Sequence, residues 1–126
     1  MQWFSSYTKR VENLENYHKE DRPWGEFEQF TLNEKTTVKI ITVQAGEALS
    51  LQTHEHRAEF WRILSGEGAV EIAGEKKRAQ PGDMFYIPQG HEHRVEGVST
   101  IVFLEIAFGE FAEADITRLE DKYGRT

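Results

Sequence analysis

Two pairs of histidines, each with a glutamate between its members, are the residues of this sequence best suited to bind a metal ion. In a β-strand, residues i and i+2 project to the same face, so a strand through the first pair would place Gln52, His54 and His56 on one side. A carboxylate follows at Glu59, and a third imidazole could come from the second pair. Imidazole and carboxylate groups together form ligand sets for divalent cations. The pairs are His54 with His56 and His91 with His93.

Strands must position these residues, and the middle of the chain has the pattern of an all-β domain. Between Gly25 and Phe108, apolar runs alternate with Gly, Pro, Asp or Asn. This spacing is typical of a β-sandwich or barrel and leaves no room for the crossover helices of an α/β fold. The predicted strands are Phe27–Leu32, Thr37–Val43, Leu49–His56, Phe60–Leu64, Gly68–Ile72, Met84–Ile87, His93–Glu96 and Ile101–Phe108.

A short helix is predicted before the β region. Its apolar residues recur at three- and four-residue steps, as on one face of an amphipathic helix. Pro23 disfavours a helical conformation at Arg22, so we expect residues 1–21 to form an N-terminal helical extension and residues 22–126 a single domain. Trp3, Phe4, Tyr7 and Val11 would need a partner surface, which predicts a homodimer. The helical positions are Phe4, Tyr7, Val11 and Leu14.

A second short helix is predicted at the C-terminal end. Ala112, Ile116, Leu119 and Tyr123 follow the helical spacing i, i+4, i+7 and i+11. Gly124 stands where a glycine commonly ends a helix.

Composition limits the functions that a chain of 126 residues can have. The net charge of −7 argues against sequence-independent binding to nucleic acid or to an anionic membrane. Because the chain has no cysteine, disulfides, zinc fingers and thiol nucleophiles are excluded. No apolar run approaches the roughly 20 residues of a membrane span, and the first residues lack the plan of a signal peptide. We therefore expect a soluble cytoplasmic protein.

The glycines and prolines around the histidines resemble the two motifs of the cupin family. The second cupin motif, G-x5-P-x-G-x2-H-x3-N, is matched by Gly82, Pro88, Gly90 and His93, with Gly97 in place of Asn. In the first motif the usual spacing of ligands is matched when it begins at Gln52 and continues through His54 to Glu59, with Gly66 as the turn glycine. His56 would then be a pocket residue beside the metal.

Four segments resemble, more narrowly, the type II mannose-6-phosphate isomerases, cupin domains often fused behind a mannose-1-phosphate guanylyltransferase. Arg22–Gly25 is similar to the signature RPWG of that family, and Gln52–Trp61 is similar to its signature QxHxHRAEHW. His93–Glu96 is similar to the signature HRLEN, and Asp115–Arg125 is similar to the signature DDIxRLEDxYGR. Phe60 departs from the pattern, because the signature has histidine there. The four segments are Arg22–Gly25, Gln52–Trp61, His93–Glu96 and Asp115–Arg125.

The resemblance implies a cupin-type antiparallel β-barrel, or jelly roll, with the C-terminal segment packed over its mouth. It also implies one divalent metal ion. A mixed nitrogen and oxygen ligand set suits Zn, Mn, Fe, Co or Ni, so the identity of the metal is left open. The implied ligands are Gln52, His54, Glu59 and His93.

The implied reaction is the interconversion of mannose 6-phosphate and fructose 6-phosphate. Either His56 or Glu59 would carry the proton, and Arg57 or Arg94 would hold the phosphate. If the family histidine takes part in proton transfer, Phe60 implies that His56 replaces it or that activity is lost. Two other functions remain open: a non-catalytic sugar-phosphate-binding module, and a different metal-dependent cupin enzyme such as a small dioxygenase.

Overall fold

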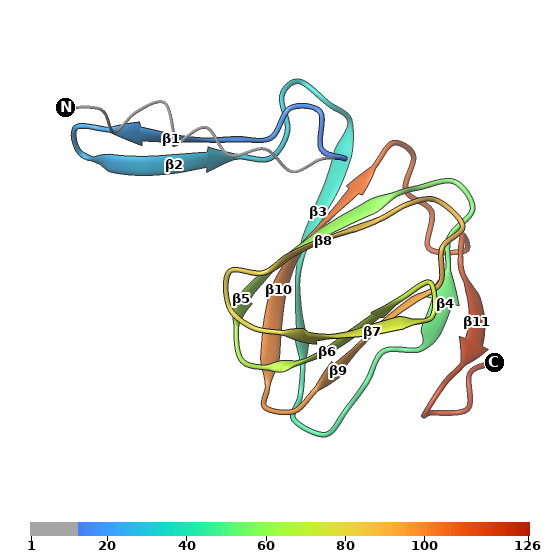
Figure 1. Ribbon diagram of the computed structural model, residues 1–126. Helices are drawn as coiled ribbons and strands as arrows, with labels where there is room; N and C mark the ends of the chain where they lie inside the picture. The colour runs from blue at the N-terminus through green and yellow to red at the C-terminus, as the bar shows by residue number, and fades with distance from the viewer. Residues whose placement is uncertain (1–12) are drawn as a thin grey trace. The chain divides into compact units, whose positions relative to one another are not determined.

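The computed structural model describes residues 13–126, and over this range the chain is all-β (Figure 1). None of the described segments is a helix that could cross a membrane. The strands are β1 His18–Arg22, β2 Gly25–Gln29, β3 Thr36–Val43, β4 Leu51–Thr53, β5 Glu59–Ser65, β6 Gly68–Ile72, β7 Glu75–Ala79, β8 Met84–Ile87, β9 His93–Gly97, β10 Ile101–Phe108 and β11 Thr117–Glu120.

The chain divides into two compact units, and the first ends at Glu34. In this unit β1 and β2 form an antiparallel hairpin in which His18 is paired with Gln29 and Arg22 with Gly25. Of the apolar positions predicted for the N-terminal helix and the dimer, Trp3, Phe4, Tyr7 and Val11 lie outside the described residues, whereas the carbonyl of Leu14 accepts a hydrogen bond from the backbone N–H of Tyr17 in a turn. Residues 18–21, which we expected to be helical, belong to β1.

The second unit, residues 35–126, contains two antiparallel sheets. One has the strand order β3-β10-β5-β8, and the other has the order β11-β4-β9-β6-β7. The strands predicted from alternating apolar runs in this unit are present, which confirms the all-β prediction.

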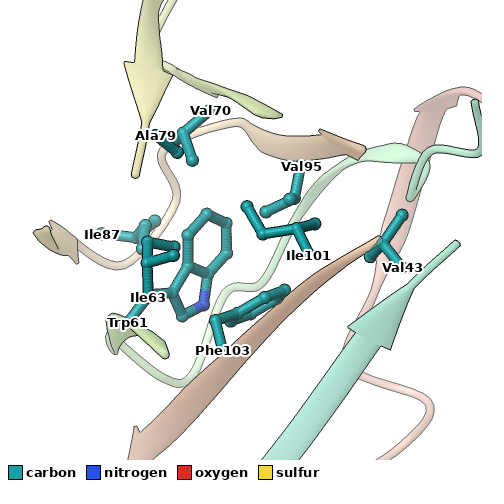
Figure 2. Packing of buried hydrophobic residues seen from close by; sticks show 9 residues of the cluster. All are labelled: Val43, Trp61, Ile63, Val70, Ala79, Ile87, Val95, Ile101 and Phe103. Atoms are coloured by element: carbon teal, nitrogen blue, oxygen red, sulfur yellow. The ribbon is translucent and has the colours of Figure 1, made fainter. Parts of the chain in front are cut away.

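The inner faces of the two sheets pack around a cluster of buried apolar side chains. Figure 2 shows the indole of Trp61 among these side chains. Burial of apolar surface contributes roughly 25 cal/mol per Å², so the packing of this cluster stabilises the second unit. Its members are Val43, Trp61, Ile63, Val70, Ala79, Ile87, Val95, Ile101 and Phe103.

The prediction of a C-terminal helix is wrong. Residues 117–120 form β11, which extends the five-stranded sheet beside β4 and pairs Arg118 with Gln52. Leu119 and Tyr123, expected on the buried face of a helix, are about half exposed. Hydrogen bonds with the edge of β4 therefore outweigh the helical spacing of a few apolar residues.

Strand β7 was not expected because its sequence, EKKRA, has no alternation of apolar and polar residues. It pairs with β6 through a two-residue turn at Ala73 and Gly74, both of which have positive φ. Such turns match the twist of the flanking strands and fix the hairpin register.

Candidate metal centre

Three side chains from distant parts of the sequence come together between the two sheets. His54 directly follows β4 and His93 begins β9, both in the five-stranded sheet, whereas Glu59 begins β5 in the four-stranded sheet. One ligand atom from each lies within 4.8 Å of the others. All three residues are at most 2% exposed. These residues are three of the four predicted ligands.

Backbone carbonyls fix the tautomer of both imidazoles. Nδ1 of His54 lies 2.6 Å from the carbonyl oxygen of Asp115, and Nδ1 of His93 lies 2.9 Å from that of His91. Because a carbonyl can only accept, each Nδ1 carries the hydrogen and each Nε2 keeps its lone pair. The two Nε2 atoms lie 3.5 and 3.6 Å from the oxygens of Glu59. This is the usual arrangement of metal-binding histidines, in which the second ring nitrogen donates to an oxygen.

The electrostatics of the three residues fit a cation. Burial lowers the pKa of His93, although the nearby charge of Glu59 opposes this shift. Its neutral form, the one that binds metals, is therefore favoured. Within the described part of the chain, Nε2 of His93 and Oε1 of Glu59 are buried without a hydrogen-bond partner. Two unpartnered acceptors facing each other are costly unless a positive charge lies near them.

Gln52, the fourth predicted ligand, lies at the edge of this cluster. It is paired with His93 between β4 and β9, and its Nε2 lies 3.2 Å from Nε2 of His54. Its Oε1 accepts a 2.6 Å hydrogen bond from Ser50. The structure thus brings Gln52 beside the cluster, and its role as a ligand remains a prediction.

Arg57 is part of the cluster and is only 7% exposed. Its Nε donates a 2.9 Å hydrogen bond to Oε2 of Glu59, and its Nη2 lies 3.3 Å from Nε2 of His54. Its Nη1 donates to the carbonyl of Ala112 at 3.2 Å, and the guanidinium stacks on Phe111 with 4.3 Å to the ring centroid. The guanidinium therefore places a positive charge directly beside the carboxylate of Glu59.

The structure does not bring His56 to the cluster. β4 ends at Thr53, so the alternation that would place His54 and His56 on one face does not continue. The side chain of His56 is 76% exposed, and Glu55 is its neighbouring carboxylate.

Arg94 also lies away from the cluster, because it follows His93 in β9 and projects to the opposite face of the sheet. Its guanidinium binds Glu71 on β6 at 3.0 Å and Glu120 on β11 at 3.1 Å. These ion pairs link β9 to β6 and to β11.

The turn that precedes His93 joins the two histidine motifs. The backbone N–H of Gly90 donates a 2.9 Å hydrogen bond to the carbonyl of His54. With φ of +79°, Gly90 adopts a conformation that side chains disfavour. The glycine of the second motif thus fixes the position of a ligand from the first.

Two further charged residues, Glu105 and Lys39, face this end of the sandwich, and neither was predicted as a site residue from the sequence. Glu105 is paired with Lys39 on β3 and Trp61 on β5, so it shares the inner face of the sheet with Trp61. Burial raises the pKa of Glu105 to about 7, and the charge of Glu59 adds to this shift. Nζ of Lys39 lies 4.3 Å from the ring centroid of Phe111. For Glu105, the signal available in the sequence was a charged residue within the apolar run of residues 101–108.

Comparison with known proteins identifies the family of this chain. Residues 9–121 match the family described as Mannose-6-phosphate isomerase C-terminal. Mannose-1-phosphate guanylyltransferase ManC of Salmonella typhimurium is 41% identical over 107 residues, covering 82% of this chain and 22% of that protein. The xanthan biosynthesis protein XanB of Xanthomonas campestris pv. campestris is 40% identical over 108 residues, covering 83% of this chain and 23% of that protein. The chain thus spans less than a quarter of the length of these curated relatives.

Solved structures share the fold. A protein titled "predicted oxalate decarboxylase" from Thermotoga maritima has a TM-score of 0.55 at 25% identity, covering 56% of this chain and 64% of that one. Salicylate 1,2-dioxygenase from Pseudaminobacter salicylatoxidans has a TM-score of 0.56 at 18% identity, covering 58% of this chain and 21% of that one. Together with the match over residues 9–121, these likenesses show that the chain belongs to the mannose-6-phosphate isomerase C-terminal family and has the cupin fold.

Proposed function

We propose that this domain is a metal-dependent aldose–ketose isomerase that interconverts mannose 6-phosphate and fructose 6-phosphate. The observation that carries the proposal is the buried group of His54, Glu59 and His93 in a chain of this family. The names of its curated relatives refer to guanylyltransferase activity or to xanthan biosynthesis, and this chain covers less than a quarter of those proteins. Their activities are therefore not assigned to it.

The proposed metal ligands are His54, Glu59 and His93, with Gln52 as the fourth. A bound divalent cation would supply Lewis-acid stabilisation for the negative charge that develops as a proton moves between C1 and C2 of the sugar. Carbonyl contacts to both Nδ1 atoms keep the imidazoles oriented, and Arg57 keeps the carboxylate of Glu59 in place.

The proton carrier is proposed among the carboxylates of the cluster rather than at His56, whose ring is largely exposed. Glu59 is one candidate. Glu105 is a second, because it projects from β10 to the same inner face as Glu59. Proton transfer requires the carboxyl group to lie within reach of the sugar, and a carboxyl group in such a position can reach a sugar bound between the sheets.

The phosphate group is proposed to bind Arg57 and Lys39, which stack on the same ring, that of Phe111. Arg94, the other predicted clamp, is left out because Glu71 and Glu120 already bind it on the outer face. The side chain of Lys39 is 40% exposed, and it forms a long ion pair with Glu113, with 3.4 Å between Nζ and the carboxylate oxygen. It can therefore reach an incoming anion at small cost.

The test measures metal content and turnover together. Protein stripped with a chelator is reloaded separately with Zn, Mn, Fe, Co or Ni and assayed with mannose 6-phosphate and with unphosphorylated mannose. We expect metal-dependent turnover of the phosphorylated sugar and poor turnover of mannose, because binding energy at the phosphate aligns the reacting carbons. His54→Ala and His93→Ala should lose the metal. His91→Ala is the matched control, since its ring is exposed and its backbone carbonyl is retained.

Two outcomes would replace the proposal. Tight binding of mannose 6-phosphate by metal-loaded protein without turnover would show a sugar-phosphate-binding module. Metal binding with no affinity for the sugar phosphate would show a different cupin function. Retention of the metal by both His54→Ala and His93→Ala would show that the ligand assignment is wrong.

A further inference from the structure

One residue of the C-terminal segment contacts three consecutive residues of the first histidine motif. Oδ1 of Asp115 accepts a 2.8 Å hydrogen bond from the backbone N–H of Glu55, and Oδ2 accepts a 3.0 Å bond from that of His56. The backbone carbonyl of the same residue lies 2.6 Å from Nδ1 of His54. Asp115 is 61 residues away from His54 in sequence, so local chain geometry does not account for this arrangement.

The carboxylate and the carbonyl of Asp115 have separate tasks. By accepting hydrogen bonds from two backbone N–H groups, the carboxylate anchors Asp115 to the loop that follows β4, residues 54–58, which we call the histidine loop. These two bonds bring the carbonyl of Asp115 to Nδ1 of His54. A carbonyl there stabilises the tautomer whose lone pair is on Nε2, the atom that faces Glu59 at 3.5 Å.

Neighbouring residues of the same segment act on a second member of the cluster. Phe111 stacks on the guanidinium of Arg57, and the carbonyl of Ala112 accepts a hydrogen bond from it. A short segment before β11 therefore supports both His54 and the arginine that holds Glu59. Asp115 is the residue of this segment whose side chain anchors it to the histidine loop.

We propose that Asp115 is a positioning residue of the metal centre, which orients His54 and fixes its tautomer by anchoring the C-terminal segment to the histidine loop. This inference rests on the proposed function only in that His54 binds a metal. Loss of such a supporting contact typically weakens metal affinity about 10–100-fold. We expect Asp115→Ala to raise the dissociation constant for Co²⁺ by about that factor.

The experiment uses the full chain, and Co²⁺ is the probe. Affinity is measured by competition with a chelator, and the visible spectrum of bound Co²⁺ reports the geometry of its ligands. Asp115→Asn keeps one acceptor oxygen, so its affinity should fall between those of the wild type and Asp115→Ala. Glu110→Ala is the matched control, because it removes a carboxylate from the same part of the chain whose partner is the exposed Lys35. This control should leave both affinity and spectrum unchanged.

A measurement on the metal-free wild type does not depend on the folding of any variant. Nitrogen-15 NMR of the imidazoles should show that the hydrogen of His54 is on Nδ1 at neutral pH. Hydrogen on Nε2, or wild-type Co²⁺ affinity in Asp115→Ala, would overturn the inference.

The results also separate this inference from the proposed function. If His54→Ala loses Co²⁺ while Asp115→Ala keeps it, only the role of Asp115 is refuted. If neither variant changes affinity, the metal centre itself is misassigned. If Asp115→Ala weakens Co²⁺ binding in a protein without isomerase activity, the positioning role stands and the isomerase proposal fails.

Discussion

Glu59 and Phe60 are neighbours in β5 and project to opposite faces of the four-stranded sheet. Glu59 joins the histidines between the sheets, whereas Phe60 is paired with Ile106 on β10 and Tyr86 on β8. Phe60 is completely buried but lies outside the apolar cluster around Trp61. The position at which the family signature has histidine therefore does not face the candidate metal centre.

Phe60→His should not raise catalytic activity. It should instead lower the free energy of unfolding by about 2–4 kcal/mol, because a polar ring replaces a fully buried aromatic one. Urea unfolding, metal content and the isomerase assay check this expectation, with Phe60→Leu as an apolar control. A large gain in turnover on introducing histidine would contradict the placement of this face.

Arg57→Ala should destabilise the metal-free protein by about 3–5 kcal/mol, since it leaves the carboxylate of Glu59 buried without its cationic partner. A bound divalent cation would supply the missing positive charge, so metal should stabilise this variant more than the wild type. Urea unfolding with and without metal measures both effects. Arg78→Ala, which removes an exposed partner of Glu67, is the control and should cost less than about 1 kcal/mol.

Lys39→Ala should weaken binding of the phosphorylated sugar. A hydrogen bond to a charged group contributes about 1.5–3 kcal/mol, which corresponds to an increase in KM of about 10-fold or more. Metal content should not change, because no described ligand contacts Lys39 directly. The comparison is Lys35→Ala, which removes a more exposed cation paired with Glu110. Equal KM values for the two variants would remove Lys39 from the phosphate site.

Tyr123→Phe should raise the pKa of Glu47. The Tyr123 hydroxyl donates a 2.5 Å hydrogen bond to this carboxylate and, with a smaller effect from Lys122, lowers its pKa below the usual 4.5. A lowered pKa in the folded state contributes stability above the unfolded pKa, and this contribution is lost as the pH falls through the folded value. Carbon-13 NMR titration of the carboxyl group measures the change. The pKa of Glu110, lowered by Lys35, should stay constant in the same spectra.

Gly66→Ala should be more destabilising than Gly82→Ala by about 1–3 kcal/mol, the usual cost of overpacking. Both glycines have positive φ, +80° and +92°, so the backbone strain of an alanine is similar. A Cβ at Gly66 would lie 1.9 Å from the carbonyl oxygen of Thr100, whereas a Cβ at Gly82 has no atom within 4 Å among the described residues. Chemical denaturation of both variants gives the difference, and equal stabilities would refute the close approach.

The parts of the structure that one local pattern determines are predictable from the sequence. Apolar runs predicted the strands of both sheets except β7 and β11. The resemblance to the two cupin motifs implied three ligands, His54, Glu59 and His93, that the structure brings together. These patterns work because the period of a strand and the φ of a glycine are local properties.

The parts that depend on contact with a distant segment are not predictable in this way. Whether His56 faces the metal centre depends on where β4 ends, and the loop after β4 is held by Asp115. The helical spacing of residues 112–123 is overridden by pairing with β4. Arg94 was selected for its charge and its neighbour, yet the alternation of β9 directs it outward.

The position of β4 between β9 and β11 also determines when the metal centre can form. Gln52 is opposite His93 on one side and Arg118 on the other, so three segments that are far apart in the sequence must meet, closing large loops of chain, before the ligands are in place. Closing such loops is entropically costly and follows the formation of local hairpins. We therefore expect the ligand set to form late in folding. Interactions that are absent from the folding transition state change mainly the unfolding rate. A metal ion bound here should therefore slow unfolding and leave the refolding rate almost unchanged.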